Sequence, residues 1–228
     1  ARIGVSRGYR VAAIGPPEHE SAETPPDPAS RNTGPVPGGL MVLLLSLAME
    51  AVLGGIGIFW IAQQGRNVIQ AIGLSTGGAA VGLAMAAAAT ALVGLSHDLV
   101  VPRIPWLNGW REWVEEQLMP FLAPLSGWEM LGVAVSAGIG EELLFRGAMQ
   151  PVIGLIPTAI IFGLAHIGGL IRRETLPYFL YTLIWGLVFG WLYDLMHVLW
   201  PLMVLHAGFD FAIVLYLRSS WRPARTGS

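Results

Sequence analysis

The stretch that decides how this sequence is interpreted is residues 128–150, WEMLGVAVSAGIGEELLFRGAMQ. Most of its positions are apolar, and as a helix rising about 1.5 Å per residue it can cross the roughly 30 Å hydrocarbon core of a bilayer. Charged side chains nevertheless stand inside it at Glu141, Glu142 and Arg146. A charge at the centre of a membrane helix costs about 2.5–3.5 kcal/mol on insertion scales. We therefore expect a membrane helix that carries part of a functional site.

The composition of the whole chain agrees with a membrane protein. Of its 228 residues, 54% are hydrophobic and only 12% are charged, against about 25% charged residues in typical soluble domains. The absence of cysteine excludes disulfides, thiolate metal sites and a cysteine nucleophile. A net charge of −2, without a long basic stretch, argues against a nucleic-acid partner.

Six apolar stretches have about the length of a membrane-spanning helix. They cover residues 40–62, 71–95, 128–150, 152–170, 176–193 and 198–217. Between the second and the third, bulky apolar side chains alternate with charged ones, which is typical of a helix lying in the membrane interface; these are Trp106, Trp110, Trp113 and Leu118 with Arg111, Glu112, Glu115 and Glu116. We predict an all-α, polytopic bundle of about six transmembrane helices plus this interfacial helix.

Composition also divides the chain into four segments. Residues 1–38 are a Pro-rich tail predicted to be disordered, residues 39–127 hold two transmembrane helices and the interfacial helix, residues 128–217 form the core with the polar motifs, and residues 218–228 are a basic tail. With a cytoplasmic N-terminus, the loops on that side hold nearly all the arginines near the membrane, and the other side holds only Arg66. By the positive-inside rule, both termini are therefore predicted to be cytoplasmic.

The charged residues of the third stretch divide into a pair and a single acid. Glu142 and Arg146 are four positions apart, so they lie on one helix face in the favoured order for an ion pair. Glu141 points about 100° away from Glu142, because a helix has 3.6 residues per turn. The same arginine therefore cannot easily neutralise both acids. We predict that Glu142 and Arg146 form a structural pair and that Glu141 is left free to act as a general base.

Two histidines and an aspartate lie at a matching depth in other stretches. His206 and Asp210 are four positions apart on one face, and His166 comes from a different helix. Counted along the helices from the outward turns, these three residues and Glu141 lie within about 9 Å of one another in depth. A carboxylate that removes a proton from water, with imidazoles that stabilise an oxyanion, suffices for hydrolysis. We predict that these four residues are catalytic.

At these positions the sequence resembles the CPBP family of intramembrane endopeptidases, which includes the type II CAAX prenyl proteases and the bacterial Abi proteins. The family pattern is EExxxR, then FxxxH, then HxxxN or HxxxD. The chain has all three parts in this order, as Glu141-Glu142-x-x-x-Arg146, Phe162-x-x-x-His166 and His206-x-x-x-Asp210. The resemblance covers about residues 128–217 and implies an all-helical membrane protease that hydrolyses a peptide of a membrane-associated substrate.

The resemblance also implies a role for each residue. Glu141 activates the water with His166 and His206 around it, and Asp210 helps to bind the water or the oxyanion. The remaining motif residues shape the site without performing the chemistry; these are Glu142, Arg146 and Phe162. An aspartate at the last position resembles the bacterial branch more than the members that act on prenylated tails, which favours a bacterial cell membrane.

Cofactors and competing functions remain open in the sequence. The family has been described both as metalloproteases and as metal-independent glutamate proteases. We favour a metal-free water, with zinc held by the two histidines, Glu141 and Asp210 as the alternative. A b-type haem protein with His166 and His206 as axial ligands, and a proton relay or transporter, are the competing functions. Glu50 and Glu129 also lie in apolar stretches, and the sequence assigns them no role.

Overall fold

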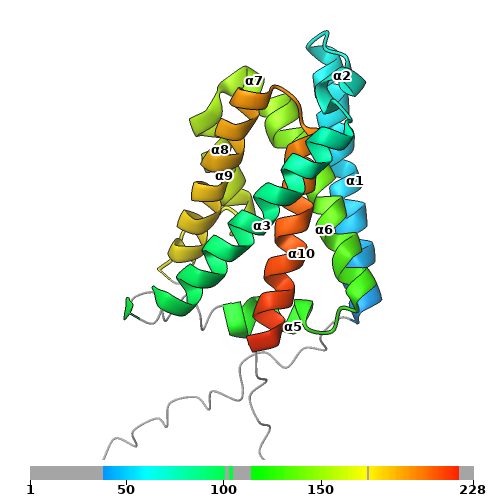
Figure 1. Ribbon diagram of the computed structural model, residues 1–228. Helices are drawn as coiled ribbons and strands as arrows, with labels where there is room; N and C mark the ends of the chain where they lie inside the picture. Colours follow the sequence, from blue (N-terminus) through cyan, green and yellow to red (C-terminus); the bar gives the residue numbers. More distant parts are fainter. Residues whose placement is uncertain (1–37, 101–102, 105–113, 174, 221–228) are drawn as a thin grey trace, which may run out of the picture. The chain divides into compact units, whose positions relative to one another are not determined.

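The structure of the chain is a computed structural model that describes residues 38–100, 103–104, 114–173 and 175–220 (Figure 1). Within these ranges the regular structure is helical, without a strand. The all-α membrane bundle predicted from the sequence is therefore confirmed. The N-terminal tail up to residue 37, the tryptophans at positions 106, 110 and 113, and residues 221–228 lie outside the described ranges.

The helices follow one another with short connections. They are α1 (Gly39–Gln63), α2 (Val68–Ile72), α3 (Thr76–Leu99), the π-helical turn η4 (Val114–Leu118), α5 (Met119–Leu122), α6 (Gly127–Glu141), the π-helical segment η5 (Glu142–Met149), α7 (Gln150–Ile153), α8 (Leu155–His166), α9 (Leu176–Met196) and α10 (Trp200–Ser220).

Local sequence sets several of the helix ends. The second apolar stretch does not begin a long helix at residue 71, because Gly73 turns the chain with φ 65° and Ser75 caps α3 by accepting a hydrogen bond from the amide of Gly78. Ser126 and Glu129 form a capping box at the start of α6. Because α10 continues to Ser220, the first residues of the expected C-terminal tail are helical.

The expected number of six membrane-spanning helices is not confirmed. In the described residues α1, α3, α9 and α10 are long and apolar enough to cross a membrane, and the segment from Glu116 through Ile153 can count as a fifth span that is bent by 113°. The fourth apolar stretch falls short, because α8 has only 12 residues. At 1.5 Å per residue this is about 18 Å, against roughly 30 Å of hydrocarbon.

The bundle has two sets of helices (Figure 1). One set is α8 with α9, and the other is α1, α3, α6 and α10. Helix α1 packs along α6 and η5, α10 packs against both α3 and α6, and α8 pairs with α9. Small residues allow the close approaches. The face of α1 that is buried carries Glu50, Gly54, Gly57 and Ile61, and a Cβ at Gly82 of α3 would lie only 2.5 Å from the carbonyl oxygen of Pro201 in α10.

The described part of the expected interfacial helix is short and lies at one end of the bundle. Residues 116–122 run at 113° to the long axis of α6 and its continuation, which suits a segment along the membrane plane. The end of α10 lies beside this segment, because the guanidinium of Arg218 donates to the carbonyl of Leu125 at 2.7 Å. The start of α1 lies there too, with Gly39 against Pro124 and Glu129. The start of α1 and the end of α10 therefore lie on the same side.

We predict that Gly57→Ala destabilises the protein and that Gly55→Ala does not. A Cβ at Gly57 would lie 2.6 Å from the carbonyl carbon of Leu143 and 2.8 Å from the amide nitrogen of Leu144. Overpacking against backbone atoms costs about 1–3 kcal/mol. At Gly55, on the same helix, a Cβ would meet nothing within 4 Å. Thermal unfolding in detergent, followed by tryptophan fluorescence, compares the variants, and equal midpoints would contradict the close contact between α1 and η5.

Candidate active site

The helix that carries the motif acids changes its winding between them. Glu141 is the last residue of α6, and the π-helical segment η5 begins at the next residue. Such segments often occur at functional sites. Two residues just after α1 contact this one: Arg66 donates to the carbonyl of Gly147 at 2.6 Å, and Gln64 donates to that of Ala148 at 2.8 Å. These hydrogen bonds tie the π-helical segment to the chain that follows α1.

The buried centre of the site is the ion pair between Glu142 and Arg146. Their side chains are 0% and 1% exposed, and Oε1 of Glu142 lies 3.0 Å from Nη1 of Arg146. The same carboxylate oxygen is 2.8 Å from Nδ1 of His206 in α10. The guanidinium also lies over the rings of Phe162 and Phe189, at 4.5 and 5.4 Å from their centroids. The pair therefore joins η5 to α8, α9 and α10.

The other motif acid faces two imidazoles. Oε1 of Glu141 is 3.9 Å from Nε2 of His166, and Oε2 is 3.8 Å from Nε2 of His206. These separations are too long for direct hydrogen bonds, and they allow a water molecule to contact the carboxylate and an imidazole together. Oε2 is buried without a hydrogen-bond partner. The three side chains that the sequence placed at one depth are thus brought together.

Hydrogen bonds at the opposite nitrogen fix the orientation of both imidazoles. Nδ1 of His166 is 2.8 Å from the carbonyl oxygen of Phe162, which can only accept, so this nitrogen carries a proton. Nδ1 of His206 is in the same way 2.8 Å from the carboxylate of Glu142. Both histidines therefore present Nε2 to Glu141.

Asp210 completes the group from the next turn of α10. Its Oδ2 lies 3.5 Å from Nε2 of His206, and its side chain is 36% exposed. It is thus more accessible than Glu141, whose side chain is 12% exposed. This position allows Asp210 to contact a bound molecule and to stabilise a protonated His206.

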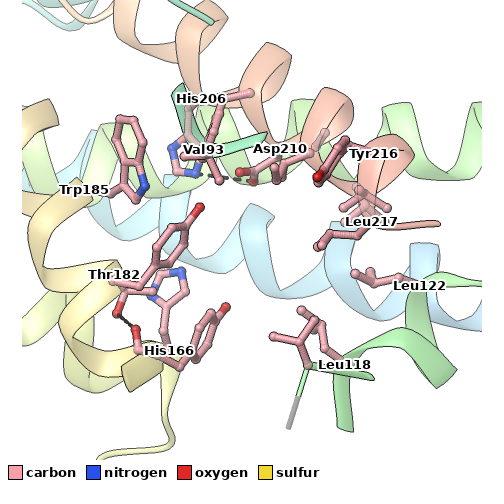
Figure 2. Close-up of a pocket in the computed structure, with 18 of the residues that line it drawn as sticks. Val93, Leu118, Leu122, His166, Thr182, Trp185, His206, Asp210, Tyr216 and Leu217 are labelled. Atoms are coloured by element: carbon pink, nitrogen blue, oxygen red, sulfur yellow. Dashed lines mark hydrogen bonds and ion pairs between the residues drawn. The ribbon is translucent and has the colours of Figure 1, made fainter. Parts of the chain in front are cut away.

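A cavity of about 230 Å³ opens from this group towards the interfacial segment (Figure 2). His166, His206 and Asp210 line one end, and Leu118 and Leu122 line the other. Most of the remaining wall is apolar or aromatic. The cavity can therefore accept an apolar chain whose end reaches the polar groups.

Glu141 does not line this cavity. Its carboxylate meets the imidazoles of His166 and His206, which do line it. A water molecule held between Glu141 and these rings would therefore sit at the cavity wall.

The described residues include no group of three or more histidine, aspartate or glutamate side chains arranged to hold a metal ion. Zinc needs ligand atoms at about 2.0–2.2 Å from a common centre. The set considered from the sequence, namely Glu141, His166, His206 and Asp210, lies together without that arrangement.

One further charged residue belongs to this region. Glu50 of α1 is only 4% exposed, and its Oε2 has no hydrogen-bond partner. It lies against Gly140, the residue before Glu141. The sequence offered only one signal for it, which is the presence of a carboxyl group inside an apolar stretch.

Comparison with known families agrees with the geometry. Residues 123–212 match the family model of Rce1-like type II CAAX prenyl endopeptidases. This segment contains all the motif residues from Glu141 to Asp210. The resemblance to CPBP intramembrane proteases is therefore confirmed over this segment, and it supports an endopeptidase role for a multi-pass membrane protein. No curated protein and no solved structure gives a significant match.

We predict that Arg146→Met strongly destabilises the protein and that adding Glu142→Gln restores part of the loss. Removal of the guanidinium leaves a fully buried carboxylate unpaired, and breaking one side of a buried pair costs about 3–5 kcal/mol. Glutamine carries no charge, and its oxygen can still accept from His206. Unfolding midpoints of both single variants and the double variant test this. If the two losses simply add, the ion pair is not the dominant interaction.

Proposed function

We propose that this protein is an intramembrane endopeptidase in which Glu141 is the general base. The observation that carries the proposal is that the two carboxylate oxygens of Glu141 face Nε2 atoms from two different helices, at 3.9 Å for His166 and 3.8 Å for His206. A water molecule between these groups has an acceptor for its proton on one side and imidazoles on the other. The family match over residues 123–212 supports the same reaction.

In the first step, Glu141 accepts a proton from the water as the water oxygen attacks the carbonyl carbon of the scissile peptide. The π electrons of that carbonyl move to its oxygen, which becomes an oxyanion. A protonated Nε2 of His166 or His206 donates a hydrogen bond to this oxygen. Asp210, at 3.5 Å from Nε2 of His206, stabilises the positive imidazolium.

In the second step, the tetrahedral intermediate collapses. The carbonyl reforms, the C–N bond breaks, and Glu141 returns its proton to the departing amine. Hydrolysis thus consumes one water molecule and yields a new carboxyl end and a new amino end.

Glu142 and Arg146 support this chemistry without taking part in it. Glu142 binds Nδ1 of His206 at 2.8 Å and so keeps Nε2 turned towards Glu141. Arg146 neutralises Glu142 at 3.0 Å. Phe162 packs between the guanidinium and the ring of His166, with ring centroids 4.4 Å apart.

The substrate is a peptide that presents an apolar segment from the membrane or its interface. The cavity leads from the polar group to Leu118 and Leu122, and large apolar side chains cover much of the outer surface of the bundle.

Helix α1 begins and helix α10 ends on the same side of the bundle. The distribution of arginines in the sequence favours the cytoplasm for this side. We assign the protein to a bacterial cell membrane, in keeping with the aspartate at the last motif position.

We predict that Glu141→Gln lowers kcat at least about a hundredfold, the lower range for loss of a general base. The glutamine keeps the shape of the side chain, so the unfolding midpoint in detergent should not fall. Cleavage is measured with quenched fluorescent apolar peptides, each with and without a C-terminal prenyl group.

Glu129→Gln is the matched control on the same helix. Glutamine keeps the capping box of α6, so this variant should cleave like the original protein. Full activity of Glu141→Gln would overturn the assignment of the base.

We predict that 1,10-phenanthroline and EDTA leave cleavage unchanged, since the proposed attack uses carboxylate and imidazole groups alone. Loss of activity on chelation, followed by recovery with added zinc, would replace this mechanism with a metal-dependent one. Metal content of the same preparation is measured by mass spectrometry in parallel.

A further inference from the structure

Glu50 is a buried carboxyl group that the proposed mechanism does not use. It lies in the middle of α1, outside the segment that matches the family model. The residue is only 4% exposed. Its Oε2 is shielded from solvent and has no hydrogen-bond partner. Burial of such a group is unfavourable unless something compensates it. A leucine or glutamine would be easier to accommodate here, so stability does not explain the carboxyl group.

The packing of α1 brings this carboxyl group against the backbone next to Glu141. Glu50 shares its helix face with Gly54 and Gly57, and these small residues let α1 approach the junction of α6 and η5. A Cβ at Gly140 would lie 2.5 Å from Oε2 of Glu50. Gly140 directly precedes Glu141, so the absence of a side chain there creates the space that Glu50 occupies.

The carboxyl of Glu50 is also within electrostatic range of the site. Its Oε2 lies against Gly140, the immediate chain neighbour of Glu141. Two carboxylates in a water-poor interior repel each other more strongly than in water. The repulsion favours conformers in which Glu141 turns away from α1 and towards the imidazoles, and it is relieved when Glu141 takes a proton.

We propose that Glu50 is a positioning residue of the hydrolytic site, which acts through Glu141 by directing its carboxylate to the two histidines and by favouring proton transfer from water. The inference rests on the proposed function. It brings α1 into a site whose other members all come from α6, η5, α8 and α10.

Steady-state kinetics separate this role from simple space filling. Glu50→Gln should lower kcat about tenfold and leave KM unchanged, because Glu50 does not line the cavity. Glu50→Asp, which keeps the charge on a shorter side chain, should recover part of kcat. If Glu50 only fills space, glutamine will match the original residue and aspartate will be the poorer replacement.

The matched control is Ser46→Ala. Ser46 lies one turn earlier on α1, where its hydroxyl is 3.4 Å from that of Ser136 in α6. This variant weakens a polar contact between the same two helices without changing a charge, and kcat should stay as it is. An equal loss of kcat in Ser46→Ala and Glu50→Gln would assign the effect to helix packing and overturn the proposal.

A second readout does not depend on peptide cleavage. Glu50→Gln should raise the unfolding midpoint in detergent, and the gain should shrink in a Glu141→Gln background, where the repulsion is already absent. An equal gain in both backgrounds, or a loss in both, overturns the role of Glu50. If the original protein cleaves no peptide, the proposed function fails, and this comparison still decides whether Glu50 acts on Glu141.

Discussion

The ion pair between Glu142 and Arg146 is the interaction on which the rest of the site depends. Both side chains are inaccessible to solvent, so neither charge is tolerable without the other. Through His206 and the ring of Phe162, the pair fixes η5 relative to α10 and α8. Glu142 orients His206 directly, and the ring of Phe162, under the guanidinium, packs against His166. A charge pair within one helical segment thus aligns three segments, namely η5, α8 and α10.

The adjacent acids have different roles because one residue of helical rotation separates them. Glu142 is occupied by Arg146 and His206, whereas Glu141 faces two Nε2 atoms at distances that leave room for water. Glu142 therefore binds the fixed positive charge of Arg146, and Glu141 keeps carboxylate oxygens available to a bound molecule. The buried oxygens of Glu50, Glu141 and Glu142 that lack a protein partner lie close together along the chain and across α1, and each costs stability unless a bound molecule contacts it.

Large apolar side chains cover the outside of the bundle, and glycines lie where its helices approach most closely. In lipid, apolar side chains can face outward without penalty, so the helices associate through small residues and polar contacts. Gly57 and Gly140 let α1 come close to the junction between α6 and η5. Arg66 and Gln64, which follow α1, then donate to the carbonyls of Gly147 and Ala148. The close approach of α1 is therefore accompanied by hydrogen bonds to the π-helical segment.

The sequence by itself determined the helical membrane fold and the residues that meet, because hydropathy and four-residue spacings are local properties. It predicted the pairing of Glu142 with Arg146 from their four-residue spacing, and it predicted the convergence of Glu141, His166, His206 and Asp210 from their depths along the helices. It could not show the short α8, the bend of 113° before α6, the π-helical turn after Glu141 or the place of Glu50. These features arise from contacts between helices distant in sequence, and only the tertiary structure decides them.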